Sequence, residues 1–271
     1  MDKINVIKVG GAVVEDSTSL NELINQFATM PGYKVLVHGG GRSATKIAAQ
    51  LGFESQMIGG RRITDENMLQ VVTMVYGGLV NKRIVAALQA KGVNAVGLTG
   101  ADMDIIRSHK REPKMVTMDD GTKHLVDFGF VGDVDYANGN RLATLIKPTN
   151  ENEAIIPVVA PLTHDGKGNI LNTNADTMAA TVAKALTDEF EVTLTYCFEK
   201  SGVMADADDD DSVIPSINTQ SYAQLKEDGI VSGGMIPKLD NAFESLDAGV
   251  KRVVITHFMD ILATQGTVIE K

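Results

Sequence analysis

Short segments that are apolar throughout recur along this chain, and each leads through a turn into a helical segment. The first two are Ile4–Val9, followed by two glycines, and Lys34–His38, followed by three. A strand that is apolar on both faces belongs in a mostly parallel sheet that helices cover on both sides. We therefore expect an α/β protein, a three-layer αβα sandwich around a mostly parallel open sheet.

The same alternation continues to the end of the chain. Helices with apolar residues on one face are expected over Ser17–Met30, Arg42–Leu51, Asp176–Leu186 and Ile236–Leu246. Thr64 is expected to cap a further long helix. Later strands are expected over Asn94–Leu98, Ala154–Val159, Val192–Cys197, Val250–Ile255 and Thr267–Glu270.

Two polar stretches interrupt this pattern. Lys110–Asp127 contains Asp119-Asp120-Gly121, which is typical of a β-hairpin turn. The acid-rich run Asp206–Asp211 is expected to be a solvated loop. No Pro- or Ser-rich linker divides the chain, so a boundary near residue 170 would separate two lobes of one continuous sheet, 1–170 and 171–271.

Charge and cysteine content exclude several classes of function. The chain has 25 Lys and Arg against 35 Asp and Glu, a net charge of −10. Such a balance argues against a nucleic-acid or membrane partner, which would need a basic surface. The single cysteine, Cys197, has apolar neighbours and is expected to be an inert core thiol. No apolar run approaches about 20 residues, so we expect a cytoplasmic enzyme or binding protein.

Glycine-rich turns follow two of the predicted strands, at the sheet edge where ligands bind in open parallel sheets. Lys8 ends the first strand before Gly10 and Gly11, which suits a phosphate group but also fits a plain turn. His38 precedes Gly39–Gly41, more glycines than a turn needs, which favours an anion-binding nest at a helix start. His38 itself is expected to be structural.

Three further motifs carry polar groups to helix starts. Arg61 and Arg62 offer planar guanidinium groups for a carboxylate, and one of them is expected to face solvent. The stretch Asn172–Asp176 has more Asn and Asp than a helix cap requires. Lys238 lies in a first helical turn, where the helix dipole disfavours a cation, so it is expected either to be solvated or to have an anion nearby.

Together these motifs predict a type of chemistry. There is no dinucleotide-binding fingerprint and no P-loop in the sequence. Two lysines, glycine N–H groups and an organising aspartate are what phosphoryl transfer needs, because that reaction depends on positioning and on neutralising charge.

In this order, the motifs resemble those of the amino-acid kinase superfamily and, within it, the acetylglutamate kinase family. The resemblance runs from Lys8 to Lys238 and beyond. It implies the amino-acid kinase fold and ATP-dependent phosphorylation of the side-chain carboxylate of N-acetyl-L-glutamate, a step of arginine biosynthesis. Lobe 1–170 would then bind the acyl-glutamate and form a homodimer, and lobe 171–271 would bind ATP.

The resemblance also implies a role for each motif. Lys8 and Lys238 would neutralise the transferring phosphoryl group, and Asp176 would hold both lysines. Contacts to the substrate would come from Gly40, Gly41, Arg62, Asn172 and Asn174. Contacts to ATP and its phosphates would come from Gly10, Gly11, Glu199, Lys200, Ser201, Gly202, Ile230, Val231 and Ser232. Mg²⁺ would be held by the ATP phosphates, with no metal ligand from the protein.

The sequence departs from the family pattern at one motif and leaves part of the function open. Glu199-Lys200 stands where the family commonly has Asp-Val, which is expected to alter nucleotide or metal contacts. Only seven residues precede Lys8, too few for the N-terminal helix of arginine-inhibited members, so an arginine-insensitive homodimer is expected. The acyl group stays open between acetyl and succinyl. Another kinase of the superfamily and a non-catalytic ligand sensor also stay open, although the two lysines disfavour the sensor.

Overall fold

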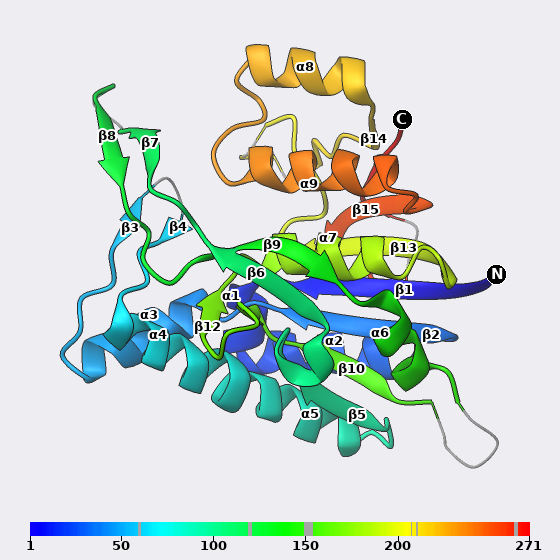
Figure 1. Cartoon of the computed structure of the whole chain (residues 1–271). Helices are drawn as coiled ribbons and strands as arrows, with labels where there is room; N and C mark the ends of the chain where they lie inside the picture. The colour runs from blue at the N-terminus through cyan, green and yellow to red at the C-terminus, as the bar shows by residue number, and fades with distance from the viewer. Residues whose placement is uncertain (59–60, 119–120, 149–153, 207, 210, 263–264) are drawn as a thin grey trace.

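A single eight-stranded sheet runs through the molecule in this computed structural model (Figure 1). The structure describes residues 1–58, 61–118, 121–148, 154–206, 208–209, 211–262 and 265–271. In sheet order the strands are β14 (Ser216–Ile217), β16 (Thr267–Ile269), β15 (Arg252–His257), β13 (Phe190–Phe198), β1 (Asp2–Val9), β2 (Tyr33–His38), β10 (Ile156–Val159) and β5 (Ala95–Leu98). Neighbours are parallel except β15 and β16. The mostly parallel open sheet is confirmed.

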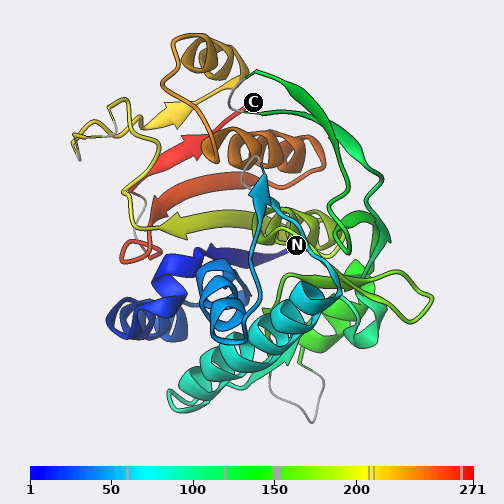
Figure 2. The same cartoon turned by 90° about the vertical axis from the view of Figure 1, so that its left-hand side faces the viewer.

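Helices cover both faces of the sheet because the strands are apolar on both faces. Ile4 and Val6 of β1 join one core with α6 (Gly139–Ile146), α7 (Ala175–Ala185) and α9 (Met235–Asp247). Ile7 and Val9 join the other core, with α1 (Gly11–Glu15), α2 (Ser17–Thr29) and α3 (Gly41–Gln50). In Figures 1 and 2 these helices lie on opposite sides of the strands. The predicted three-layer sandwich is therefore confirmed.

The two parts of the chain share this sheet. β1 pairs with β2 on one side and with β13 on the other, so the sheet crosses the proposed boundary near residue 170 without a break. The helix α8 (Thr219–Glu227) lies outside α9, where the Tyr222 and Phe243 rings stack with their centroids 5.2 Å apart. No linker separates the lobes among the described residues.

One long helical segment packs beneath the sheet. It runs from α4 (Glu66–Val72) through a π-helical turn, Thr73–Val80, into α5 (Asn81–Gln89). It is long and apolar enough to cross a membrane by length and composition. However, residues along its length, Val71, Ile84 and Leu88 among them, are fully buried in the core of this fold. It is a core helix rather than a membrane span.

The predicted cap of this helix was wrong by one residue. Asp65, not Thr64, caps α4, because its Oδ1 accepts a hydrogen bond of 2.8 Å from the N–H of Met68. Thr64 instead forms a β-bridge with Gly129. Its hydroxyl accepts a 2.9 Å hydrogen bond from the Asn172 side chain, so Thr64 connects the start of α4 to the strand Ile170–Asn172.

A smaller four-stranded sheet and two hairpins surround the carboxyl edge of the main sheet. The small sheet has the order β12 (Ile170–Asn172), β11 (Leu162–His164), β6 (Ile106–Lys110), β9 (Gly132–Ala137). The hairpins are β3–β4 (Met57–Ile58 and Arg61–Arg62) and β7–β8 (Lys114–Thr117 and Lys123–Val126). The hairpin predicted within Lys110–Asp127 is confirmed; its turn residues Asp119 and Asp120 lie outside the described residues.

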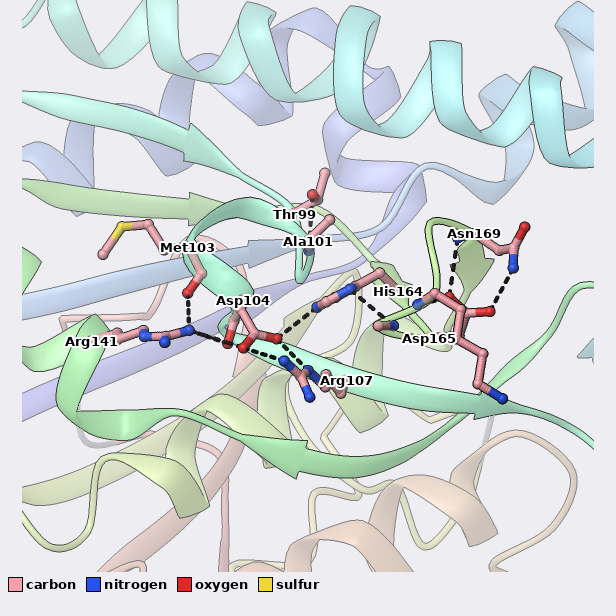
Figure 3. A network of polar contacts seen from close by, with 11 residues as sticks. Thr99, Ala101, Met103, Asp104, Arg107, Arg141, His164, Asp165 and Asn169 are labelled. Carbon is pink, nitrogen blue, oxygen red and sulfur yellow. Dashed lines mark hydrogen bonds and ion pairs between the residues drawn. The ribbon is translucent and has the colours of Figure 1, made fainter.

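A polar network centred on Asp104 joins this small sheet to α6 (Figure 3). The Asp104 carboxylate accepts bonds from Arg107 Nε (2.6 Å), Arg141 Nη1 (3.0 Å) and His164 Nε2 (2.9 Å). Met103 and Asp104 have left-handed backbone conformations, with φ of 54° and 52°, and Arg141 also bonds the Met103 carbonyl at 2.8 Å. The hydrogen bond from Arg107, together with those from Arg141 and His164, lowers the pKa of Asp104 to about 2.

The acid-rich run is exposed where it is described. Asp206 and Asp209 accept bonds from the backbone N–H groups of Asp208 and Asp211, which makes local turns. Ala207 and Asp210 lie outside the described residues. The predicted solvated loop is confirmed for the others.

Candidate active site

Three charged side chains meet at the carboxyl edge of the main sheet. Lys8 Nζ lies 2.7 Å from Asp176 Oδ1, and Lys238 Nζ lies 3.1 and 3.2 Å from the two Asp176 oxygens. Lys8 ends β1, Asp176 is in the first turn of α7, and Lys238 is in the first turn of α9. Residues from opposite ends of the sequence thus form one cluster, as the resemblance implied.

The alternation of β1 explains why Lys8 reaches this cluster. Lys8 lies on the same strand face as Ile4 and Val6, which pack against α7 and α9. Lys238 sits over two aromatic rings, with Nζ 5.1 Å from the Tyr196 centroid and 5.7 Å from that of Phe198. The Lys238 ammonium group is therefore held between two aromatic rings and the Asp176 carboxylate, which also binds Lys8.

The cluster carries one more positive than negative charge. Burial alone would raise the pKa of the Asp176 carboxyl, but the ammonium groups of Lys8 and Lys238 outweigh it and hold that pKa at about 2. Burial and repulsion from Lys8 lower the pKa of Lys238. One carboxylate cannot fully compensate two buried ammonium groups, so the cluster has the charge to attract an additional anion.

Two glycine turns lie beside each other at the same edge. A Cβ on Gly11 would lie 3.5 Å from the Gly40 nitrogen, and one on Gly39 would lie 3.2 Å from the Gly11 nitrogen. A Cβ on Gly39 would thus be in tight contact with the Gly11 backbone, whereas one on Gly11 would be in ordinary van der Waals contact with Gly40. Gly40 and Gly41 also open α3, and a Cβ on Gly40 would meet the Tyr76 ring at 3.0 Å. The turns therefore combine backbone N–H donors with a helix start, as an anion site needs.

A cavity of about 380 Å³ lies next to these turns. Gly40, Gly41, Arg62, Asn172 and Asn174 all line it. The structure thus brings the five residues predicted for the substrate to one cavity.

Arg62 is positioned before any ligand arrives. Its Nη2 donates to the Gly41 carbonyl (2.8 Å) and to Thr45 Oγ1 (2.9 Å), and its Nη1 bonds Ser55 Oγ. Arg62 is 9% exposed, whereas Arg61 is exposed. The expectation that one arginine of the pair faces solvent is confirmed, although Arg61 also lines the cavity. Gly59 and Gly60, which precede them, lie outside the described residues.

The two asparagines have structural partners as well. Asn174 caps α7, because its side chain accepts from the N–H groups of Asp176 (2.8 Å) and Thr177 (3.2 Å). Asn172 donates to the Thr64 hydroxyl. The side-chain oxygen of Asn174 is therefore used in capping the helix. The cap also fixes the turn from which the Asp176 side chain reaches the two lysines.

Several further residues line the cavity, and those with aromatic or charged side chains that were missed from the sequence are Tyr76, Arg111, Lys114 and Asp133. Arg111 is 7% exposed and its Nε lies 3.0 Å from Asp133 Oδ2 across the β6–β9 edge. Tyr76 belongs to the π-helical turn. The sequence offered two signals, an arginine within a predicted polar segment and two glycines after Tyr76, but neither identifies a cavity.

The segments predicted for the nucleotide follow β13 and precede α9. Glu199, Lys200, Ser201 and Gly202 lead away from the end of β13, and a Cβ on Gly202 would meet Thr267 Oγ1 at 2.7 Å. Ile230 and Ser232 lie before α9, but the Val231 side chain is buried in the core. The side chain of Val231 thus serves packing, and a nucleotide could meet only its backbone.

His38 and Cys197 are structural, as expected. His38 is fully buried, with Nδ1 2.7 Å from the Gly39 carbonyl and Nε2 3.1 Å from Asn81 Nδ2. The neutral tautomer that donates from Nδ1 and accepts at Nε2 satisfies both contacts. Burial lowers the pKa of His38 to about 4 and raises the pKa of Cys197 to about 12. At neutral pH His38 is therefore an uncharged, weak base with both ring nitrogens engaged, and Cys197 stays a protonated thiol.

The chain is similar to known proteins over its full length. The family model described as "Amino acid kinase family" matches residues 3–257. An acetylglutamate kinase of Phocaeicola vulgatus is 58% identical over 270 residues, which is 100% of this chain and 99% of that protein. One of Bacteroides thetaiotaomicron is 59% identical over the same shares.

Solved structures agree in fold. The crystal structure of smu.665 from Streptococcus mutans has a TM-score of 0.76 at 26% identity and 98% coverage of each chain. A carbamate kinase of Giardia has a TM-score of 0.66 at 17% identity, covering 99% of each chain, and shares the fold alone. By these matches, the chain belongs to the amino acid kinase family and, within it, to the acetylglutamate kinases.

Proposed function

We propose that this protein transfers the terminal phosphoryl group of ATP to the side-chain carboxylate of N-acetyl-L-glutamate, giving N-acetyl-L-glutamyl 5-phosphate for arginine biosynthesis. The observation that carries the proposal is the Lys8–Asp176–Lys238 cluster, a buried group with surplus positive charge beside two glycine turns. Membership of the acetylglutamate kinases supports the choice of substrate.

The chemistry needs positioning and charge neutralisation. The acceptor carboxylate is already ionised at neutral pH, so it attacks without a general base. Negative charge spreads over the equatorial oxygens of the phosphoryl group as it transfers. A unit charge pair at 4 Å contributes about 4 kcal/mol at an effective dielectric constant of 20, so Lys8 and Lys238 can supply several kcal/mol. The N–H groups of Gly11 and Gly40 add donors that need no reorganisation. The Gly10 N–H instead donates to the Cys197 carbonyl at 3.1 Å, so it is not available to the phosphoryl group.

Asp176 acts on the reaction through the lysines. It holds both ammonium groups within 3.2 Å of its own oxygens, which fixes their separation before the substrates bind. We therefore treat Asp176 as a positioning residue that also keeps Lys238 protonated.

The acyl-glutamate would occupy the cavity of about 380 Å³. Arg62 would take a substrate carboxylate, since its guanidinium lines the cavity and is held by Gly41 and Thr45. Asn172 and Asn174, with the N–H groups of Gly40 and Gly41, would contact the remaining polar groups. ATP would lie on the 171–271 side, against the Glu199–Gly202 and Ile230–Ser232 segments.

A divalent cation would enter with ATP. Among the described residues, no three His, Cys, Asp or Glu side chains gather to hold a metal ion, and Asp176 is taken up by two lysines. The residues present thus do not fit a protein-held metal, whereas Mg²⁺ keeps waters and binds substrate phosphates readily. We propose that this cation is Mg²⁺ and that the ATP phosphates hold it. We also propose that the protein is a cytoplasmic homodimer.

The charge of the cavity favours N-succinyl-L-glutamate as a second candidate substrate. Its lining includes Arg61, Arg62, Arg111 and Lys114 against one acid, Asp133. Partial desolvation and then repulsion from Arg111 lower the pKa of Arg61, and attraction by Asp133 opposes this change. A succinyl group would bring one more carboxylate to the cavity than an acetyl group.

Release of ADP with four acceptors tests the proposal: N-acetyl-L-glutamate, N-succinyl-L-glutamate, L-aspartate and UMP. We expect turnover with the acyl-glutamates and none above background with the other two. A higher kcat/KM for the succinyl compound would select the second candidate. Turnover with aspartate or UMP alone, or with none of the four, would overturn the proposal.

A further inference from the structure

A second cavity, of about 160 Å³, lies on the other face of the main sheet. Its lining residues come from β1, β13, β15 and the segment after β15: Asn5, Thr193, Thr195, Arg252, Val254, Thr256 and Ile261. Because side chains alternate along β1, Asn5 points away from the face that carries Lys8. This cavity is therefore separated from the catalytic cluster by the thickness of the sheet.

The polar character of this cavity is unusual for its position. On the same sheet face, Ile7, Val9 and Cys197 belong to the apolar core. Farther along the same strands, Asn5, Thr193 and Arg252 lie directly beside one another across β1, β13 and β15. Adjacent strands are about 4.8 Å apart, so these three side chains can reach one small ligand together.

Two polar groups of the cavity have no hydrogen-bonding or ion-pair partner among the described residues of the protein. Thr256 is 1% exposed and its Oγ1 has no partner among the described residues. Arg252 forms no ion pair within 4.0 Å with any carboxylate in the described parts of the chain. A buried hydroxyl without a partner is destabilising, and a hydrogen bond to a bound ligand atom would remove that penalty.

We infer that this cavity is a second binding site, specific for a small oxyanion. The Arg252 guanidinium supplies positive charge and a planar pair of donors, and the Thr193, Thr195 and Thr256 hydroxyls and the Asn5 amide complete a set of donors. Typical pockets for larger organic ligands measure about 300–1,000 Å³. At about 160 Å³ this one takes a phosphate ion or a small carboxylate but no nucleotide.

Calorimetric titration of the full chain with inorganic phosphate tests the inference. The catalytic cleft is first saturated with N-acetyl-L-glutamate and the magnesium complex of a non-hydrolysable ATP analogue. The analogue fills the position of the transferring phosphoryl group, so phosphate binding in the cleft does not contribute. We expect one saturable site in the wild type. Arg252→Gln and Thr256→Val should each weaken phosphate binding by about tenfold or more, the usual loss when a charged or buried donor is removed.

Lys251→Gln is the matched control, since it removes the exposed neighbouring charge outside the cavity and should bind phosphate like the wild type. Both cavity variants should keep the wild-type kcat, which shows that they fold. Thr256→Val should also keep or raise the melting temperature, because it removes an unpaired buried hydroxyl. Titration with acetate separates a carboxylate preference from a phosphate preference.

Two results would overturn the inference. One is the absence of saturable binding of both phosphate and acetate to the wild type. The other is phosphate binding by Arg252→Gln or Thr256→Val that matches the wild type, because the anion would then lie elsewhere.

Discussion

His38 illustrates how an ionisable residue can serve the fold beside an active site without taking part in the reaction. Its ring nitrogens are both engaged, by the Gly39 carbonyl and by Asn81. Asn81 also donates a 2.9 Å bond to the Val158 carbonyl. Neutral His38 thus connects the start of α5 to the glycine turn that follows β2, and it keeps that turn in place.

His38 should make stability depend on pH. Its folded pKa is about 4, below the ordinary value of 6.5, so the unfolded chain binds more protons between these values. The contribution of His38 to the free energy of unfolding is then fully present above about pH 6.5 and is lost as the pH drops toward 4. The loss amounts to roughly 3 kcal/mol. Urea unfolding at several pH values measures it.

Two histidine variants sharpen that measurement. His38→Gln removes the titrating ring and should flatten the decline between pH 6.5 and 4. His124→Gln, at an exposed position, should keep it. Equal slopes in all three proteins would contradict the role assigned to His38.

At the scale of elements, the small sheet depends on Asp104 for its attachment. This carboxylate bonds Arg107 at the start of β6, Arg141 of α6 and His164 of β11 (Figure 3). It also lies next to Met103 in a left-handed pair of residues. The network fixes the start of β6, the first strand after β5 of the main sheet. It thereby helps to set where the paired strands β6 and β9 place Arg111 and Asp133.

Asp104→Ala should therefore lower the melting temperature clearly more than Asp135→Ala. Asp135 forms a single exposed ion pair with His109, and such pairs contribute little. The Asp104→Ala substitution, by contrast, removes the bonds to Arg107, Arg141 and His164 at once. Differential scanning calorimetry compares the two variants, and equal shifts would show that the network does not hold the small sheet.

The main elements were predictable because their signals are local. Ile4–Val9 is a short run dominated by apolar residues, and the structure forms β1 there. Local signals also explain the error at α4, since Thr64 and Asp65 are both good capping residues and only the bridge to Gly129 decides between them. The strand expected from Ala154 begins at Ile156.

The candidate site was predictable only in part. Lys8, Asp176 and Lys238 were found because each stands at a glycine turn or helix start that belongs to a known pattern. Arg111 and Asp133 were missed because they lie 22 positions apart and meet only through the pairing of β6 with β9. No local pattern reveals that pairing.

At the scale of the whole molecule, the net charge of −10 describes the surface and not the site. The cations that face the proposed substrates are few and are concentrated at one edge of the sheet. Two exposed apolar residues on the long helix, Met74 and Leu79, are the clearest candidates for an interface between subunits.

Met74→Glu with Leu79→Glu should convert the proposed homodimer into monomers. A charge on each side of a shared apolar surface costs several kcal/mol of association. Sedimentation velocity measures the change, and Met115→Glu, also an exposed methionine but on the β7–β8 hairpin, is the control. A wild-type monomer, or a double variant that stays dimeric, would contradict this assignment.

The central claim is that Lys8 and Lys238 stabilise the phosphoryl group as it transfers. Steady-state kinetics of Lys8→Ala and Lys238→Ala, with the exposed Lys3→Ala as control, tests it most directly. Loss of one such contact should lower kcat by about 10²–10³-fold and change KM for the acyl-glutamate much less. Lys3→Ala should match the wild type. An unchanged kcat in either cluster variant would contradict the claim.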